Sequence, residues 1–325
     1  MYGKETKTPE DYYTASDFRF SITQDKSEVT ELAKKVKHIN INNEQVETYI
    51  KLVKRDTKSN KIVSLSSATF GIKATENIYD RATDKLLYAK GQLITQKVGS
   101  TTYSYFTTNS DNVIVPAQSY NTKDDPKGSI ITPLQLPVGS YEVFELKIPF
   151  GFLQLDKNIA FTVKNIKDYD TDVDGDFIKT IDIHNEQPTG TLIIDKFVTL
   201  RENVDTSLVD ISDLSGISFK LEAKENIVDM SDGSLYYKKG DVLGIYNLQR
   251  DGSLKIDNLP IGEYLCYEWS TLPGLVLNGE MFEIKFTQND TVTKIYTETR
   301  EIENKTTIFE FSKTDITGDE ELERC

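Results

Sequence analysis

The chain has 325 residues, and its 38 Lys and Arg against 52 Asp and Glu give a net charge of −14. This acidity argues against a nucleic acid or an anionic membrane as a partner, because neither attracts a strongly negative surface. The length predicts about two domains. Two cysteines, Cys266 and Cys325, and two histidines, His38 and His184, exclude a disulfide scaffold and a cysteine-based zinc site and leave little room for His-dependent catalysis. We expect no metal and no cofactor.

Strand patterns dominate the chain. Short runs rich in Ile, Val, Thr, Tyr and Phe alternate with polar residues and predict an all-β protein. In chain order, the clearest runs are 49–54, 141–145, 180–184, 191–196 and 264–268. Helical spacing of apolar residues is found at 28–37 and predicts one short helix. The stretch 91–128, rich in Ser, Thr, Tyr and Asn, predicts a long loop or an added hairpin.

Several sequence blocks recur in the same order along the chain, as in a repeat protein. Glu-Asn-Ile, Leu-Pro-x-Gly-x-Tyr and Asn-Glu-Gln occur first at 76–78, 136–141 and 43–45, and again at 225–227, 259–264 and 185–187. This order predicts two complete repeats and parts of two more. The C-terminal part of a repeat spans 1–44, the complete repeats span 45–187 and 188–305, and the N-terminal stub of a further repeat spans 306–325. The chain is therefore expected to be a window of a longer tandem array.

Three polar residue types recur at matched places in the repeats: a Lys on the first strand, a Glu after the Leu-Pro-x-Gly turn, and an Asn at the end of the last strand. In the two complete repeats these residues are Lys54, Glu145 and Asn185, and then Lys196, Glu268 and Asn304. The partial repeats carry their counterparts Glu5, Asn43 and Lys313.

Strand phase gives these polar residues a buried position. Side chains on a strand alternate between its two faces, and Lys54 is in phase with Ile50 and Leu52. Asn43 is likewise in phase with Ile41 and Ile39. We therefore expect each recurring Lys, Glu and Asn to point the same way as its apolar neighbours, into the core.

Burying an uncompensated lysine and glutamate is costly, so the three residues need an arrangement that offsets the cost. A buried ion pair is one solution. The other is covalent: burial lowers the pKa of the Lys and raises that of the Glu. A neutral amine is a nucleophile, and a protonated carboxyl group polarises an amide. Attack on the Asn amide with loss of ammonia would leave an isopeptide bond between the first and last strands.

The repeated blocks resemble the CnaB-type, SpaA-like (prealbumin-like) domains of Gram-positive surface adhesins and pilins. The matching segments are 54–56, 68–72, 136–141 and 145–149, with Asn185 at the close, and an N-terminal Glu-Thr-x-x-Pro-x-x-Tyr motif at 5–12. The resemblance implies tandem immunoglobulin-like sandwiches of seven strands. It also implies Lys54–Asn185 and Lys196–Asn304 isopeptide bonds, formed with Glu145 and Glu268 as catalysts.

The second repeat departs from this pattern in two places. Lys196 is followed by Phe197 and Val198, where the first repeat has Arg55 and Asp56. The stretch from Glu268 to the next proline is one residue longer than in the first repeat.

The function that this resemblance implies is that of a structural stalk on a Gram-positive cell wall, with neighbouring repeats of the same array as partners. The polar first ten residues are not a secretory signal peptide, and no sorting signal is present, so signal and anchor are expected to lie outside this chain. The alternative is an adhesive module that binds a host or matrix ligand through 91–128. An enzyme acting on other molecules is not expected, because the carboxylates form no paired motif with a substrate site.

The acidic run from Asp170 to Asp174 resembles the start of a calcium-binding EF-hand loop. The last ligand position of such a loop falls on Ile181 rather than on Glu, so a polar turn is the preferred interpretation. We expect His184 to face solvent and Cys266 to be an inert buried thiol.

Overall fold

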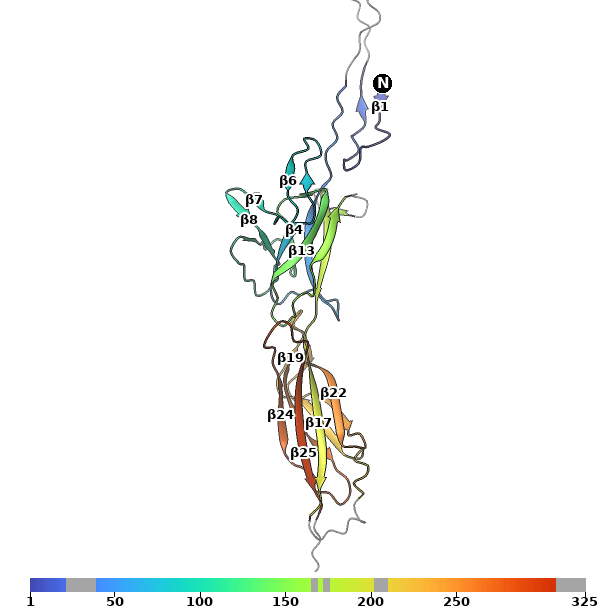
Figure 1. The fold of residues 1–325 in the computed structure, drawn as a ribbon, viewed down its shortest axis with the longest axis vertical. Coiled ribbons are helices and arrows are strands. Elements are labelled where there is room, and N and C mark those ends of the chain that lie inside the picture. The colour runs from blue at the N-terminus through green and yellow to red at the C-terminus, as the bar shows by residue number, and fades with distance from the viewer. Residues whose placement is uncertain (22–38, 165–168, 172–175, 202–209, 308–325) are drawn as a thin grey trace, which may run out of the picture. The chain divides into compact units, whose positions relative to one another are not determined.

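The computed structural model describes residues 1–21, 39–164, 169–171, 176–201 and 210–307 (Figure 1). The chain divides into two compact units, Met1–Glu186 and Gln187–Cys325. In these described ranges the regular structure is entirely β, as the sequence predicted. None of their elements is a helix long and apolar enough to cross a membrane. The short helix expected at 28–37 and Lys313 lie outside the described residues, as does most of the acidic run after Asp170.

The first unit contains two packed sheets. One has the strand order β10-β9-β4-β13-β14, and the other has the order β11-β3-β16-β15, with β12 also paired to β3. The strands of the first sheet are β4 (Thr69–Ala74), β9 (Tyr105–Thr107), β10 (Ser119–Tyr120), β13 (Gly139–Lys147) and β14 (Ile159–Val163). Those of the second are β3 (Glu47–Asp56), β11 (Ser129–Ile131), β12 (Leu136–Pro137), β15 (Asp170–Thr171) and β16 (Phe177–Asn185).

The core of the first unit lies between these sheets because each strand turns its alternate apolar residues inward. Leu52 of β3 and Ile183 of β16 come from one sheet, and Phe70 of β4 and Val143 of β13 from the other; all four are fully buried. The predicted strands 49–54, 141–145 and 180–184 are confirmed within β3, β13 and β16.

The first unit exceeds the seven strands that the resemblance implied. Much of the difference comes from 91–128, where a hairpin pairs β7 (Gln96–Val98) with β8 (Thr101–Tyr103), and where β9 and β10 extend one sheet. A further ribbon pairs β5 (Ile78–Tyr79) with β6 (Leu86–Tyr88). The added hairpin expected in this stretch is therefore confirmed, and two sheet strands accompany it.

The second unit has, within its described residues, seven strands in two sheets with the orders β22-β17-β25 and β21-β18-β23-β24. They are β17 (Thr189–Thr199), β18 (Ser218–Ala223), β21 (Val242–Asn247), β22 (Ser253–Pro260), β23 (Gly262–Ser270), β24 (Met281–Phe286) and β25 (Ile295–Lys305). A small ribbon pairs β19 (Ile227–Val228) with β20 (Leu235–Tyr237). Both sheets contribute to one core cluster, so this unit is also a β-sandwich.

The first and last strands of each sandwich are parallel neighbours in one sheet. Lys54 of β3 lies opposite Ile183 of β16. Lys196 of β17 lies opposite Ile302 of β25. In both units the recurring Asn follows that opposite residue by two positions, so it points to the same side of the sheet as the Lys.

The repeated Leu-Pro-x-Gly-x-Tyr block is a turn closed by its own tyrosine. The hydroxyl of Tyr141 donates to the carbonyl oxygen of Pro137 at 2.7 Å, and that of Tyr264 donates to Pro260 at 2.6 Å. Each tyrosine ring is fully buried. The turn therefore fixes the start of the strand that carries Glu145 or Glu268, which explains why this block recurs as a unit.

The N-terminal segment pairs β1 (Tyr2–Gly3) with β2 (Phe18–Arg19) in antiparallel register. The phase argument placed Ile39 and Ile41 in a core, and this expectation was wrong. Their exposed fractions are 41% and 44%, because no strand in the described part of the chain pairs with residues 39–43.

Candidate functional site

The second unit brings its three predicted residues into mutual contact. Lys196 Nζ lies 2.5 Å from Asn304 Oδ1 and 3.4 Å from Glu268 Oε2. Asn304 Nδ2 donates to Glu268 Oε1 at 2.7 Å. The side chains of Lys196 and Glu268 have no exposed surface, and Asn304 is 2% exposed. Amine, carboxyl and amide thus form a closed triangle inside the core.

The first unit assembles the same three residue types with a different lysine contact. Asn185 Nδ2 donates to Glu145 Oε2 at 2.7 Å. Lys54 is fully buried, and its amine donates to the carbonyl oxygen of Ile183 at 3.1 Å. Asn185 Oδ1 and Glu145 Oε1 are buried without a hydrogen-bond partner. A buried polar atom without a partner is costly, so two oxygens of this site are left in an unfavourable state.

Burial shifts the pKa values of Lys54, Glu145 and Lys196 in the direction that amine attack needs. Desolvation lowers the pKa of Lys54 to about 8, although the charges of Glu145 and Asp56 oppose the shift. Desolvation also raises the pKa of Glu145, against the effects of Lys54 and of the Asn185 hydrogen bond. The pKa of Lys196 is lowered by desolvation too, with Glu268 opposing. Each lysine therefore gives up its proton more readily than a solvated one.

The backbone positions each lysine through a glycine. The amide of Lys54 donates to the carbonyl oxygen of Gly128 at 2.8 Å, and that of Lys196 donates to Gly252 at 2.9 Å. Gly252 has a φ of +88°, and a Cβ there would collide with the carbonyl oxygen of Lys196. Only glycine fits a positive φ with such a close backbone approach, so this turn is tied to the placement of the lysine.

A loop after each glutamate holds the Glu–Asn pair. The residue eight positions after the Glu donates its amide to the carbonyl of the residue that follows the Asn. Leu153 donates to Glu186, and Val276 to Lys305, both at 2.8 Å. The residue ten positions after the Glu donates its amide to the Glu carboxylate. Asn278 does this for Glu268 at 3.1 Å, and the backbone of Leu155, the matching residue of the first unit, lowers the pKa of Glu145 against the larger effect of desolvation.

The N-terminal segment repeats this loop geometry around the predicted pair Glu5 and Asn43. Asn43 Nδ2 donates to Glu5 Oε2 at 2.7 Å and to the carbonyl of Tyr13 at 2.9 Å. The amide of Ala15 donates to Glu5 Oε2 at 2.7 Å. Tyr13 and Ala15 follow Glu5 by eight and ten residues. The Glu–Asn pair is thus built here in the same way, with both residues half-buried.

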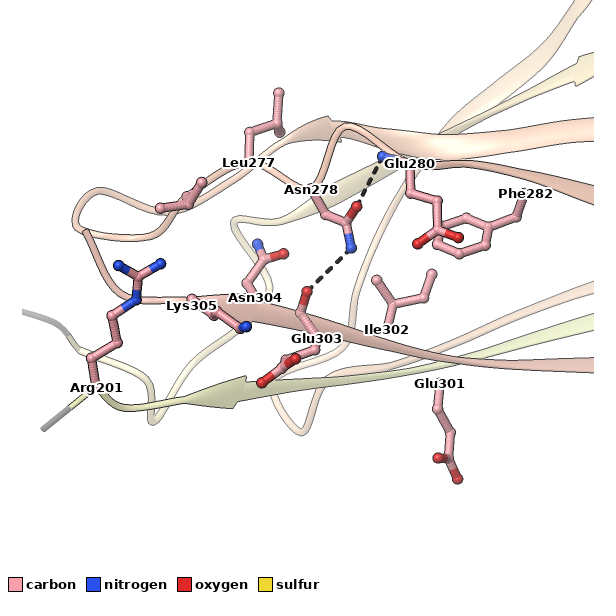
Figure 2. Close-up of a pocket in the computed structure, with 11 residues that line it drawn as sticks. Arg201, Leu277, Asn278, Glu280, Phe282, Glu301, Ile302, Glu303, Asn304 and Lys305 are labelled. Carbon is pink, nitrogen blue, oxygen red and sulfur yellow. Dashed lines mark hydrogen bonds between the residues drawn. The ribbon is translucent and has the colours of Figure 1, made fainter. Parts of the chain in front are cut away.

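A surface pocket of about 380 Å³ in the second unit has Asn304 among its lining residues. Its walls are Arg201, the loop 276–280, Phe282 and the end of β25 (Figure 2). Asn278 connects the loop to β25. Its Oδ1 accepts from the amide of Glu280 at 2.9 Å, and its Nδ2 donates to the carbonyl of Glu303 at 3.2 Å. The pocket therefore places a solvent-accessible space beside the buried Asn side chain.

Two further expectations are confirmed. His184 is exposed and contacts Asn60 Oδ1 at 3.1 Å. Cys266 is 1% exposed, and burial raises the pKa of its thiol to about 12. The described ranges contain no cluster of three or more His, Cys, Asp or Glu that could hold a metal ion.

Three residues near the sites were missed by sequence reasoning about function. Asp56 is buried beside Lys54. Thr271 and Asn278 contact Asn304 and Glu268 through hydrogen bonds. The one available signal was the extra residue between Glu268 and Pro273, which indicated a different loop but not its contacts.

Residues 205–301 match the family model described as "SpaA: Prealbumin-like fold domain". This match confirms the predicted SpaA-like prealbumin fold, directly for the second unit. A comparison with curated protein sequences gave no match.

Solved structures with detectable likeness include proteins of Gram-positive bacteria. "The Bacillus anthracis TIE protein" is 19% identical, with a TM-score of 0.45, over 94% of this chain and 42% of that one. A streptococcal ancillary pilin is 17% identical, with a TM-score of 0.26, over 94% and 73%. The shaft pilin SpaA from Lactobacillus rhamnosus GG is 12% identical, with a TM-score of 0.26, over 81% and 98%. The chain spans less than half the length of the first of these.

Proposed function

We propose that this chain is part of a structural stalk on the surface of a Gram-positive bacterium, in which each sandwich closes an intramolecular isopeptide bond between its first and last strands. The bonds join Lys54 to Asn185 and Lys196 to Asn304. The observation that carries the proposal is the buried contact of Lys196 Nζ with Asn304 Oδ1 at 2.5 Å, with Glu268 bonded to both residues.

The chemistry needs only the three side chains. The Lys gives its proton to the Glu, and the neutral Lys amine then attacks the amide carbon. The new C–N bond forms, and the Glu carries a proton from the attacking nitrogen to the departing one. The C–N bond of the Asn amide then breaks and ammonia leaves. Each chain performs this reaction once per site, so the protein is not an enzyme acting on other molecules.

The unpartnered oxygens of the first site fit the same chemistry. Asn185 Oδ1 lacks a donor, and Glu145 Oε1 lacks any partner. A proton on Glu145 removes the charge that burial penalises, and it lies next to the departing nitrogen of Asn185, which contacts Glu145. The raised pKa of Glu145 favours that protonated form.

In the second unit Asn304 lines a surface pocket, through which the released ammonia would reach solvent. Loss of ammonia into bulk water makes the bond irreversible in practice, as a stalk under mechanical force requires.

The strand arrangement explains what the bond would do mechanically. The first and last strands of each unit are parallel neighbours, and each Lys and Asn lies near the C-terminal end of its strand. A bond between them therefore joins the end of the first strand to the point at which the chain leaves the sandwich. A pulling force applied along the chain would then pass through the covalent bond and leave the core unloaded. We propose Glu5, Asn43 and Lys313 as members of further sites of this kind, with neighbouring repeats as partners.

Intact mass measurement of the purified chain tests this function. We expect a deficit of two ammonia molecules relative to the sequence mass, and tryptic mapping should find the branched peptides that contain Lys54–Asn185 and Lys196–Asn304. An unmodified mass would overturn the proposal, because the buried triads would then be ion pairs and hydrogen bonds alone.

The alternative function, adhesion to a host or matrix ligand through 91–128, is favoured by one observation. This stretch exposes adjacent large apolar side chains, with exposed fractions of 63% for Ile114 and 46% for Val115. Binding of the chain to immobilised matrix proteins that is lost in the Ile114→Ser/Val115→Ser double variant would support this function. Unchanged binding in that variant would refute it.

A further inference from the structure

The amide of Asn304 is held by a side chain where the other Glu–Asn pairs use the backbone. Asn185 Nδ2 donates its second hydrogen to the carbonyl of Leu153 at 2.7 Å, and Asn43 Nδ2 donates to the carbonyl of Tyr13 at 2.9 Å. Both acceptors stand eight residues after the Glu. Asn304 Nδ2 donates instead to Thr271 Oγ1 at 2.9 Å.

The loop that would supply the backbone acceptor is present in the second unit. Val276 occupies the place of Leu153, and its amide makes the equivalent 2.8 Å hydrogen bond, to Lys305. Thr271 lies in the segment between Glu268 and Pro273, which is one residue longer than its counterpart in the first repeat. The residue three positions after the Glu is Thr271 here and Ile148 in the first repeat. A hydroxyl group therefore stands at this place in the second unit, and the acceptor changes from backbone to side chain.

The consequence concerns the orientation of the amide. With one hydrogen on Glu268 Oε1 and the other on Thr271 Oγ1, the nitrogen end of the Asn304 amide is fixed. Its oxygen must then face Lys196 Nζ. If the amide turned over, its oxygen would face Glu268, and the departing nitrogen would lose the contact through which the Glu can supply its proton. In the observed orientation the Thr271 hydroxyl accepts from that nitrogen and helps to hold it on Glu268.

We propose that Thr271 is a positioning residue for bond formation in the second unit, acting through the orientation of the Asn304 amide. The inference rests on the proposed isopeptide function. It also predicts an asymmetry: bond formation in the second unit depends on a replaceable side chain, whereas the first unit uses the carbonyl of Leu153.

The test compares Thr271→Val, which removes the hydroxyl and keeps the shape, with Thr271→Ser, which keeps the hydroxyl. Full-length chains made by cell-free translation are quenched in acid at intervals, and mass spectrometry quantifies both branched peptides. We expect Thr271→Val to slow the Lys196–Asn304 bond roughly five- to tenfold, the factor that one neutral hydrogen bond is worth. The Lys54–Asn185 bond in the same molecule should form at the wild-type rate, and Thr271→Ser should restore the second bond.

A positioning role also predicts that Thr271→Val lowers the rate at every pH without moving the pH at which the rate is half-maximal. A wild-type rate in Thr271→Val would overturn the inference, as would a Thr271→Ser variant as slow as Thr271→Val, since packing of the methyl group would then be the cause. Absence of the second bond in the wild-type chain would instead overturn the proposed function at that site.

Discussion

Lys196 Nζ and Asn304 Oδ1 lie 2.5 Å apart in the core of the second sandwich, although 108 residues separate the two in sequence. The contact exists because β17 and β25 are parallel neighbours whose register places Asn304 two residues beyond the position opposite Lys196. The same two-residue offset relates Asn185 to Lys54. A shared register in both units is the geometric basis of the predictions that follow.

Each glutamate should control one bond only. In Glu145→Ala the Lys54–Asn185 peptide should be absent and the Lys196–Asn304 peptide present, because each carboxyl group contacts the reacting Asn of its own unit. Glu268→Ala should show the reverse, and the double variant should retain the full sequence mass. Tryptic mapping with mass spectrometry measures all three. If both bonds survive in either single variant, the glutamates are not the acids of the reaction.

The rate of Lys54–Asn185 bond formation should fall as the pH rises through about 8, the lowered pKa of Lys54. The reactive state, neutral Lys54 with protonated Glu145, holds one proton between the two groups, as their ion pair does. Raising the pH through the Lys54 value removes that last proton and leaves no acid. Lowering the pH far enough to add a second proton leaves no nucleophile. Acid-quenched time courses between pH 5 and pH 10 measure the profile, and a rate still rising at the alkaline end would exclude a role for the acid.

Asp56 should affect the pH dependence of Lys54–Asn185 bond formation. Its charge raises the pKa of Lys54 against the larger effect of desolvation, so Asp56→Asn should lower that pKa further and move the alkaline fall in rate to lower pH. The Asn side chain keeps an oxygen that can accept from Ser59, as Asp56 Oδ1 does. The control is Asp182→Asn, which removes an exposed carboxylate from the neighbouring strand. An equal shift in both variants would show a general charge effect.

The bonds should stabilise each sandwich by about as much as a cross-link closing a loop of the same length. For loops of more than a hundred residues, chain entropy gives about 5 kcal/mol, or roughly 10–20 °C in Tm for a unit of this size. Glu268→Gln, which keeps the side-chain shape but cannot act as the acid, should lower the melting temperature of the second unit by that amount. Scanning calorimetry measures the change.

The control for this melting experiment is Glu283→Gln, on the exposed face of β24, which should melt as the wild type does. A Glu268→Gln chain that also melts at the wild-type temperature would show that no covalent bond stabilises the second unit.

The positions of strands could be predicted from the sequence, because the alternation of apolar and polar residues is a local property. The runs 49–54 and 264–268 lie inside observed strands, and the inward direction of Lys54 followed from its phase with Leu52. The phase argument failed at Ile39 and Ile41, which are exposed. Alternation selects a face of a strand, but only a second layer packed against that face makes it a core.

The side-chain contacts within each site could not be predicted from the sequence in the same way. Sequence spacing indicated that a Lys, a Glu and an Asn recur together, but it did not separate the closed triangle at Lys196 from the first site, where Lys54 contacts the carbonyl of Ile183. It also gave no sign that Thr271 replaces a backbone carbonyl as the acceptor for Asn304. Such differences depend on rotamers and loop paths that neighbouring strands impose.

The all-β class, the repeat order and the three residue types could be predicted from the sequence, because alternation and recurrence depend only on the order of the residues. Only the tertiary structure decided that the first and last strands are parallel neighbours in a register that brings Lys and Asn to one side of the sheet. It also decided how deeply these groups are buried, and burial is what lowers the pKa values of Lys54 and Lys196. Burial is a property of the packed sandwich, since both sheets must close over a side chain before water is excluded from it.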